Sequence, residues 1–434
     1  MKSFSSSVKR TKWIESKSVY VWNVLGGVLN AGQSALILMV ISRTSSIEDS
    51  GIYSLAYAIA SLALTLGLFG VRHYQASDVK EKYKFEFYYS SRVLTIILMC
   101  LLITYYLVNG YFFKNYSPHK CLTICLVGLL KVVDAFEDVF HGRLQQKQKL
   151  KTAAKSITIR YIFILLFIVL SLLIFHNINI SIAVGLLVSL ISFSVSFFVY
   201  RSFLGVDFCK IKFSFESIKL LSECFAVAVG NFVMIYIANA PKYAIDKYMN
   251  ETIQTYFNYI FMPVYVISTL CLYIFQPSIT KMSKQLEKNN ISSFYKSFWS
   301  LIVLTLFVCF CVLIGGMTIG IPVLNFLYNT DLSLYKDSFF VLLIGGCILA
   351  FSVLFSVCII IIRQQKYLLV GYLISALASF FASDLMVKKA GITGASFLYL
   401  FCIAIQAVIF FVIMIIGFTK VKKRDWKIKQ EQVV

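Results

Sequence analysis

Long apolar stretches recur along the whole chain of 434 residues. A helix needs roughly 20 mostly apolar residues to cross the hydrocarbon core of a bilayer. Twelve stretches meet that length, and they lie near residues 18–42, 51–71, 88–108, 118–140, 157–175, 179–201, 219–240, 253–275, 297–317, 338–362, 367–386 and 392–418. A chain that is 59% hydrophobic and 14% charged cannot bury so many apolar side chains in a water-soluble domain. The sequence therefore predicts an all-α, multi-pass membrane protein.

The chain divides naturally after the sixth apolar stretch. A polar connection near residues 201–217 leaves six predicted spans on each side. We therefore expect two six-helix lobes, residues 1–210 and 211–434. Two halves with the same number of spans are typical of transporters built from parallel repeats.

The basic residues indicate the orientation. With twelve spans both termini lie on one side, and that side holds thirty-two of the 41 Lys and Arg residues, against eight on the other. Basic residues concentrate on the cytoplasmic side of membrane proteins, so both termini are predicted to be cytoplasmic. The net charge of +21 thus orients the chain and faces anionic headgroups, and we expect no nucleic-acid partner. No cleavable signal peptide is evident.

The segment LLKVVDAFEDVFHG, residues 129–142, places ionisable side chains inside a predicted span. At 100° per residue, Lys131, Asp134, Glu137, Asp138 and His141 share an arc of about 120°. One charge in lipid at mid-bilayer costs about 2.5–3.5 kcal/mol, so this stripe must face protein or water. The last three residues lie near the predicted cytoplasmic end, where reaching the interface is the alternative. Lys131 and Asp134, spaced i,i+3, are either cavity-lining residues or a structural ion pair.

Two further spans carry polar faces. Asn30 and Gln33 share one face of the first span, and Asn231, Asn239 and Lys242 share one face of the seventh. Both faces are candidates for lining one central cavity. The alternatives are interhelical hydrogen bonds, which are common in membranes, and for Lys242 a position at the membrane rim.

No motif predicts catalysis. The four histidines are dispersed, and HExxH, GxSxG and phosphate-binding Gly-rich patterns are absent from the sequence. The eleven cysteines show no metal-ligand spacing and are predicted to pack as small apolar residues. We expect neither an enzyme nor a bound cofactor or metal. Transport would be driven by an ion gradient, the substrate gradient or the membrane potential.

Three stretches carry a family resemblance: FGVRHYQASDVKEKY (residues 69–83), EDVFHGRLQQKQKLKTAAKSITIRYIF (137–163) and PKYAIDKY (241–248). With the 6 + 6 layout, they resemble the polysaccharide-biosynthesis branch of the multidrug/oligosaccharidyl-lipid/polysaccharide exporter (MOP) superfamily. This branch includes flippases of O-antigen (lipopolysaccharide) and capsule repeat units. The matching residues are Arg72, Gln75, Ser77, Asp78, Gly142, Gln145, Ser156, Arg160, Lys242, Asp246 and Tyr248. Arg143, Lys151 and Ala154 depart from the pattern.

The resemblance implies a MATE-like fold, a V-shaped cavity between the lobes, and alternating access. It also implies a cargo, a polyprenyl-diphosphate-linked oligosaccharide that is flipped from the cytoplasmic to the outer leaflet. A diphosphate needs cations, for which Lys131, Arg72, Arg160 and Lys242 are the candidates. The sugar needs amides, which Asn30, Gln33, Asn231 and Asn239 can supply.

Asp134, Glu137 and Asp138 are candidates for carrying a coupling proton or sodium ion. The expected location is the plasma or inner membrane of a bacterium or archaeon. The lipid-linked oligosaccharide and the phospholipid bilayer are the expected partners, and the polymerase and glycosyltransferases of the same pathway are further candidates. Two other functions stay open: a drug or metabolite cation antiporter of the same superfamily, and a membrane-embedded glycan polymerase or ligase.

Overall fold

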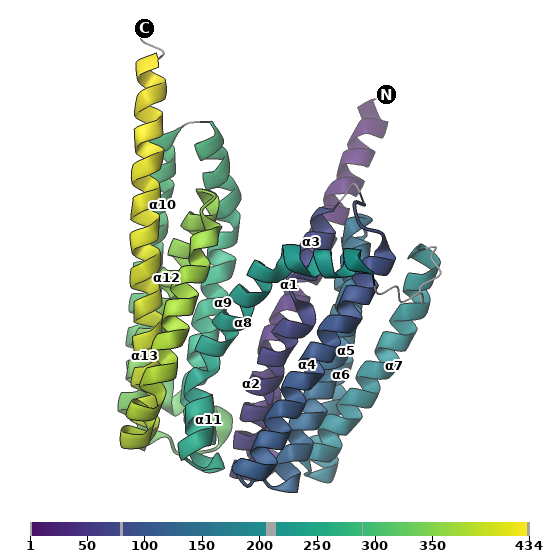
Figure 1. Ribbon diagram of the computed structural model, residues 1–434, viewed down its shortest axis with the longest axis vertical. Coiled ribbons are helices and arrows are strands. Elements are labelled where there is room, and N and C mark those ends of the chain that lie inside the picture. Colours follow the sequence, from purple (N-terminus) through teal and green to yellow (C-terminus); the bar gives the residue numbers. More distant parts are fainter. Residues whose placement is uncertain (1, 79–80, 205–213, 289, 432–434) are drawn as a thin grey trace. The chain divides into compact units, whose positions relative to one another are not determined.

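The structure, a computed structural model, describes residues 2–78, 81–204, 214–288 and 290–431, and the described residues form helices joined by short connections (Figure 1). The chain divides into an N-terminal unit, Met1–Phe232, and a C-terminal unit, Val233–Val434. The division falls within a single helix, α8 (Phe215–Tyr248). The predicted lobe boundary at residues 210 and 211 lies outside the described residues and stays a prediction.

The other helices of the N-terminal unit are α1 (Lys2–Thr44), α2 (Ile47–Leu68), α3 (Val71–Ser77), α4 (Phe85–Phe113), α5 (Pro118–Gln146), α6 (Leu150–Phe175) and α7 (Ile178–Leu204). The C-terminal unit continues with α9 (Glu251–Glu287), α10 (Ile291–Gly315), a π-helical turn (Gly316–Gly320), α11 (Ile321–Tyr328), α12 (Lys336–Ile361) and α13 (Leu368–Glu431). Short 3₁₀ turns, Ser333–Tyr335 and Gln365–Tyr367, precede α12 and α13.

Each of the twelve predicted spans corresponds to one long helical segment, although the predicted span 51–71 extends past the end of α2 at Leu68 into the first residue of α3. Gly391 separates the last two, because its φ of 56° and ψ of −130° break α13 in a region of backbone space that is nearly restricted to glycine. By length and hydropathy alone, eight helices among the described residues are able to cross a membrane, or nine when the two parts of α1, bent by 45° around residue 31, are taken as one span. One of the eight, Gln365–Val421, contains both parts of α13. Ionisable residues interrupt the apolar sequence of α5, which is why it does not meet the same test.

Polar residues define where several helices begin. Ser46, Ser117, Asn250 and Asn290 each precede a helix and accept a hydrogen bond from a backbone N–H in its first turn. These side chains satisfy amide groups that the helix leaves without partners. In α5 the first residue is Pro118, which suits a position whose N–H has no intrahelical acceptor.

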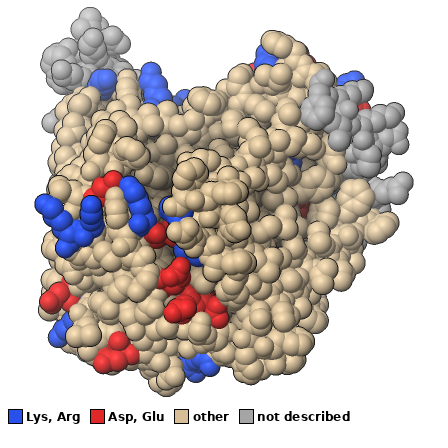
Figure 2. Space-filling view, turned by 60° about the horizontal axis from the view of Figure 1, so that its bottom comes forward, with Lys and Arg blue, Asp and Glu red and all other residues tan. Residues whose placement is uncertain are grey.

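The outer surface matches a lipid environment. Large apolar side chains such as Phe113, Phe198, Phe326 and Phe381 are more than two-thirds exposed. Water-soluble monomers rarely expose apolar surface on this scale. Figure 2 shows a face on which broad areas carry no Lys, Arg, Asp or Glu. The described helices therefore form a multi-pass membrane protein.

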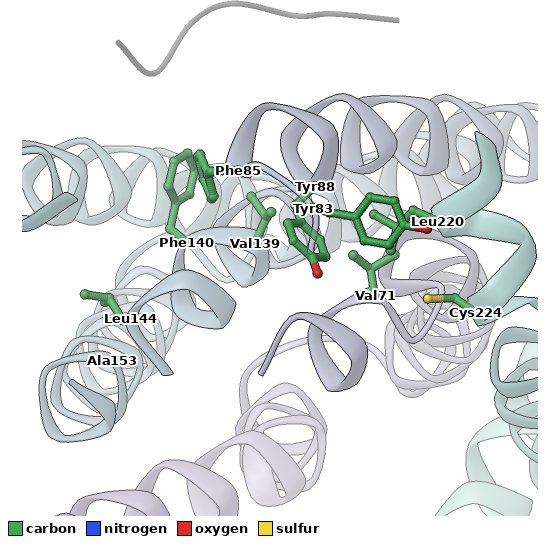
Figure 3. Packing of buried hydrophobic residues seen from close by; sticks show 10 residues of the cluster. All are labelled: Val71, Tyr83, Phe85, Tyr88, Val139, Phe140, Leu144, Ala153, Leu220 and Cys224. Carbon is green, nitrogen blue, oxygen red and sulfur yellow. The ribbon is translucent and has the colours of Figure 1, made fainter. Parts of the chain in front are cut away.

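Within the N-terminal unit, α5 is the central helix and packs against α2, α3, α4, α6 and α7. Its apolar side is buried as well as its polar side. Val139 and Phe140 belong to an aromatic-rich cluster whose members also include Phe85 and Tyr88 (Figure 3). The helix α5 is thus enclosed by protein on both sides.

Candidate functional site

The ionisable residues of α5 lie in the interior of the N-terminal unit. Lys131 is 2% exposed, Glu137 0% and His141 2%, and Asp138 is also buried. Side chains that simply reached the membrane interface from a helix end would be exposed to solvent. Burial thus excludes this alternative for the last three residues, and the site is built around α5.

Lys131 is held by groups from three helices. Its Nζ lies 2.9 Å from Asp134 Oδ2, in the i,i+3 ion pair that the spacing predicted, and 3.3 Å from Gln33 Oε1 of α1. It also lies 5.2 Å from the centre of the Tyr57 ring of α2, at cation–π distance. The ammonium group is therefore fixed in position, with the buried Gln33 as its second polar partner.

Arg160 of α6 connects two carboxylates on α5. Its Nη2 forms an ion pair with Asp134 Oδ1, and its Nε lies 3.0 Å from Glu137 Oε2. Glu137 Oε1 lies 3.3 Å from His141 Nε2 one turn further along. Asp134 therefore bridges Lys131 and Arg160, so the two cations are joined through one carboxylate.

Asp138 is the centre of a second set of contacts. Arg92 Nη2 of α4 lies 2.7 Å from Asp138 Oδ2, and Arg72 Nη1 of α3 lies 3.2 Å from Asp138 Oδ1. Arg92 also donates to the carbonyl of Gly67, which accepts a 2.8 Å hydrogen bond from Thr95 Oγ1 as well. Asp138 thereby ties α3 and α4 to α5.

These two sets of contacts, which we call together the α5 network, contain four cations and three carboxylates. Removing water from each ion costs several kcal/mol, and this cost is recovered only when every charge has close partners. Each carboxylate here lies next to at least one guanidinium group. Two of the four cations, Lys131 and Arg92, lie behind the carboxylates that they contact.

A cavity of about 290 Å³ opens beside this network. Its described lining comes from α1, α2, α3, α5 and α6 and consists of Trp22, Asn23, Gly26, Gly27, Asn30, Leu64, Leu68, Arg72, Asp134, Glu137, Asp138, His141, Ala154, Ile157, Arg160 and Tyr161. The volume holds roughly ten water molecules and lies at the small end of ligand pockets. The lining combines two guanidinium groups and three carboxylates with amides and aromatic rings. The guanidinium groups suit a phosphate, and the amides suit sugar hydroxyls.

The loop pattern after the second span positions Arg72. A Cβ on Gly142 of α5 would lie 2.8 Å from Gln75 Cδ and 3.5 Å from Arg72 Cγ, so only glycine lets α3 approach α5 this closely. With its amide group in the favourable orientation, the buried Gln75 donates to Val139 O and accepts from Arg143 N. These contacts hold Arg72 at the wall of the cavity.

Asp78, from the same pattern, stabilises the connection between α3 and α4. It accepts hydrogen bonds from Lys82 N at 2.8 Å, Tyr83 N at 3.2 Å and Tyr88 Oη at 2.9 Å. Partial burial alone raises the pKa of this carboxyl group, but the hydrogen bonds outweigh burial and lower the pKa below its ordinary value. Asp78 does not line the cavity described above.

The predicted residues of the seventh span lie apart from this network in the sequence. Lys242 is buried in the C-terminal unit, 5.4 Å from the Tyr265 ring centre and 5.8 Å from that of Phe261. Asn239 donates to Ile235 O and accepts a 3.3 Å hydrogen bond from Tyr265 Oη. The burial of Lys242 is inconsistent with an ordinary rim position.

The structure therefore brings together six of the nine predicted substrate-binding residues, all in the N-terminal unit: Asn30, Gln33, Arg72, Lys131, Asp134 and Arg160. Lys242 and Asn239 lie in the other unit, and the half-buried Asn231 lies in the part of α8 that belongs to the N-terminal unit. A central cavity shared by both units stays a prediction.

Sequence reasoning missed Arg92 as a site residue, whereas it named Arg160 as a candidate cation for the diphosphate. Both were counted among cytoplasmic basic residues, but Arg92 is 0% and Arg160 2% exposed, inside helices. The missed signal was their position within the predicted spans 88–108 and 157–175, where an ionisable residue indicates function or pairing. Among the described residues no group of three His, Cys, Asp or Glu side chains is arranged to hold a metal ion.

Solved structures of similar fold define the class of protein. The chain matches the inward-facing conformation of a multidrug resistance MATE family transporter of the MOP superfamily with a TM-score of 0.68, covering 93% of this chain and 99% of that one at 14% identity. A eukaryotic MATE transporter, AtDTX14, matches with a TM-score of 0.60 over 95% and 99% of the two chains at 12% identity. The predicted MATE-like, all-α membrane fold is confirmed.

Sequence comparison identifies the family. A family model described as polysaccharide biosynthesis protein matches residues 19–283, more than half of the chain. The chain belongs to this family, as the three sequence stretches predicted. A relative from Staphylococcus aureus, capsular polysaccharide biosynthesis protein CapF, is 23% identical over 393 residues, which cover 86% of this chain and 92% of the relative.

Proposed function

We propose that this protein is a flippase for surface-polysaccharide precursors, which moves polyprenyl-diphosphate-linked oligosaccharide repeat units from the cytoplasmic to the outer leaflet by alternating access. The observation that carries the proposal is the pair of guanidinium groups in the cavity wall, Arg72 and Arg160, each held in place by a buried carboxylate of α5. Membership of the polysaccharide biosynthesis family and the transporter fold support it.

Each part of this cargo has a chemical counterpart in the chain. Guanidinium groups bind phosphate oxygens in pairs, so Arg72 and Arg160 suit the diphosphate. Asn30 offers an amide to sugar hydroxyls. Lys131 acts indirectly, because it positions Asp134 and so fixes Arg160. Lys242, Asn231 and Asn239 contribute from the second predicted lobe, and the prenyl chain stays in lipid.

The carboxylates give the network a means of coupling to a proton or sodium ion. Asp134, Glu137 and Asp138 all line the cavity and all pair with arginine. In this proposal a coupling ion bound at Asp134 competes with Arg160 for the carboxylate, while Arg160 keeps its contact with Glu137. Release of the ion restores the contact between Asp134 and Arg160.

In the cell, we propose, both termini are cytoplasmic, the protein resides in the plasma or inner membrane of a bacterium or archaeon, and it is not an enzyme. The polymerase and glycosyltransferases of the same pathway are its proposed partners, since they produce and consume the cargo. The orientation rests on the distribution of Lys and Arg.

A cation antiporter is the second candidate. Three carboxylates in the cavity wall favour it, because they are able to attract a cationic drug. The four cations of the network oppose it, since each carboxylate is already paired.

Reconstitution in liposomes separates these functions. With a fluorescent polyprenyl-diphosphate-linked oligosaccharide, the protein is expected to speed exchange between leaflets. Arg72→Gln is expected to lower the rate, because Asp138 keeps Arg92 as its partner while the cavity loses a cation. The exposed Lys281→Gln in α9 is the matched control and should keep the wild-type rate.

Two results would contradict the flippase proposal. One is a cationic drug that is exchanged while the glycan lipid is not, which indicates the antiporter. The other comes from deletion in cells, where monomeric lipid-linked units accumulating on the outer face would indicate a lost polymerase. The flippase proposal requires these units to accumulate on the cytoplasmic face.

A further inference from the structure

A second and larger cavity lies between α6 and α7 of the N-terminal unit, which pack side by side (Figure 1). It has a volume of about 850 Å³. Its lining from α6 is Lys151, Thr152, Lys155, Ser156, Ile159, Arg160, Phe163 and Phe167, and from α7 Val188, Ile191, Ser192, Val195 and Ser196. We call it the α6–α7 groove. Neither the proposed transport path nor the family resemblance accounts for it.

The α6 side of the groove is a single ridge. Lys151, Lys155, Ile159, Phe163 and Phe167 follow one another at four-residue spacing and so lie on one face of the helix. From Lys155 to Phe167 the helix rises by about 18 Å at 1.5 Å per residue. One leaflet contributes about 15 Å to a hydrocarbon core of roughly 30 Å. The ridge thus runs from a basic end through the depth of one leaflet.

The polar groups lie at one end of the groove. Lys151 and Lys155 are exposed and form no ion pair among the described residues, and no described lining residue is acidic. Ser156 and Ser196 hydrogen-bond to each other across the groove at 2.7 Å. Beyond them the lining is mostly apolar, with Phe163 the first aromatic side chain of the ridge.

Arg160 adds a donor at the level where the polar and apolar parts meet. It lines the groove as well as the inner cavity, it is 2% exposed, and its Nη1 has no hydrogen-bond partner among the described residues. An unpaired buried donor is costly, so an acceptor at this position is favoured. It lies about 7.5 Å along the helix from Lys155, between the two lysines and the apolar part of the groove.

We propose that the α6–α7 groove binds an anionic phospholipid, with its phosphate at Lys151 and Lys155 and an acyl chain along Phe163, Phe167 and the apolar residues of α7. Two unpaired cations at one end and an apolar channel of leaflet depth match a molecule with an anionic head and a hydrocarbon chain. A partner helix would not require this separation of charge from apolar surface. The inference is independent of the cargo that the protein transports.

Lipid binding to the purified full-length protein tests the site. The probes are dioleoyl phosphatidylglycerol, dioleoyl phosphatidylcholine and glycerol 3-phosphate. Their binding is measured by thermal unfolding in detergent and by native mass spectrometry. Phosphatidylglycerol is expected to bind and to raise Tm more than phosphatidylcholine, which has the same chains. Glycerol 3-phosphate is expected to have no effect, because it lacks the chains that fill the groove.

Variants assign the effect to this groove. Lys151→Glu with Lys155→Glu is expected to weaken phosphatidylglycerol binding at least about tenfold and to leave phosphatidylcholine binding unchanged. Ile191→Trp, which fills the apolar part, is expected to reduce the binding of both lipids. The matched control is Lys281→Glu with Lys284→Glu, two exposed lysines of α9 outside the groove, which should behave like the wild type.

The proposal is overturned if both lipids bind the wild type equally, or if the Lys151 and Lys155 variant keeps its preference for phosphatidylglycerol. It is also overturned if the Lys281 and Lys284 variant loses that preference to the same degree. An equal effect of glycerol 3-phosphate would assign the anion site to a soluble phosphate instead. Flipping by the same variants is a separate measurement, so the transport proposal can fail without affecting this one.

Discussion

At the scale of single residues, the number of carboxylates that each cation contacts sets its importance. Arg160 contacts both Asp134 and Glu137, whereas Lys131 contacts only Asp134. A charge that loses its partner inside a protein is far more costly than a pair that is replaced as a whole. The two cations are therefore expected to differ even though they share a carboxylate.

Arg160→Met is expected to lower the free energy of unfolding by about 3–5 kcal/mol, and Lys131→Met by less, because Asp134 keeps Arg160 in the second variant. Thermal unfolding in detergent measures which of the two variants is less stable.

Lys131→Ala is further expected to abolish surface glycan while membrane insertion and abundance stay normal. Wild-type export by this variant would exclude a role for Lys131 in the transport site.

A pH-dependent contribution is expected from Asp78. Its pKa is lower in the folded protein than its ordinary value, because hydrogen bonds outweigh partial burial. The stability that it adds is therefore fully present above its unfolded pKa, about 3.9, and is lost as the pH falls through the lower folded value. Asp78→Asn is expected to cost about 1 kcal/mol at neutral pH, a solvent-screened fraction of its hydrogen bonds.

Unfolding of both proteins from pH 7 to pH 3 checks this expectation. The difference between wild type and variant should be constant near neutral pH and shrink only below about pH 4. Glu287→Gln, at an exposed carboxylate in the last turn of α9, supplies the control. A difference for Asp78→Asn that grows on acidification would contradict the assigned sign.

At the scale of elements, the fit of α3 against α5 rests on the missing side chain of Gly142. A Cβ there would overlap the buried Gln75 and lie in ordinary van der Waals contact with Arg72. Gly142→Ala is expected to cost about 1–3 kcal/mol through overpacking, despite the higher helix propensity of alanine. Gly315→Ala in α10, where no atom lies within 4 Å of the added Cβ, is the control and should be neutral or stabilising.

A double-mutant cycle tests the cause. If the overlap with Gln75 is responsible, Gly142→Ala with Gln75→Ala is expected to cost less than the sum of the single variants. Additive costs would show that the helix tolerates a Cβ at Gly142 and that the loss arises elsewhere. Thermal unfolding in detergent again provides the measurement.

The helices also show which structural features can be predicted from the sequence alone. The positions of the twelve spans and the polar face of α5 follow from local composition and periodicity, which need no knowledge of neighbours. The partners of that face do not follow. Arg92, Arg72 and Gln33 come from helices remote in sequence, and periodicity specifies a direction without naming the helix that lies there. The sequence pattern likewise does not specify which helices cover the apolar face of α5.

At the scale of the whole molecule, the size of the inner cavity limits what the N-terminal unit can do alone. About 290 Å³ accommodates a phosphate with part of a sugar, and an oligosaccharide on a diphosphate is several times larger. Under the proposed function, the rest of the cargo must contact residues outside this cavity. The polar residues around Lys242 in the C-terminal unit are the candidates, although they belong to a different compact unit.

Cysteine accessibility in a variant without the native cysteines tests whether residues of both units contact the cargo. Asn30→Cys and Asn239→Cys are each expected to react with a membrane-impermeant thiol reagent, and bound lipid-linked oligosaccharide is expected to slow both reactions. Phe113→Cys, at an exposed lipid-facing site, should be unaffected by the cargo. Protection of Asn30→Cys alone would confine recognition to the N-terminal unit. Protection of Asn239→Cys as well would show that the cargo is recognised by both halves of the chain, since Asn239 and its hydrogen-bond partner Tyr265 both lie in the C-terminal unit.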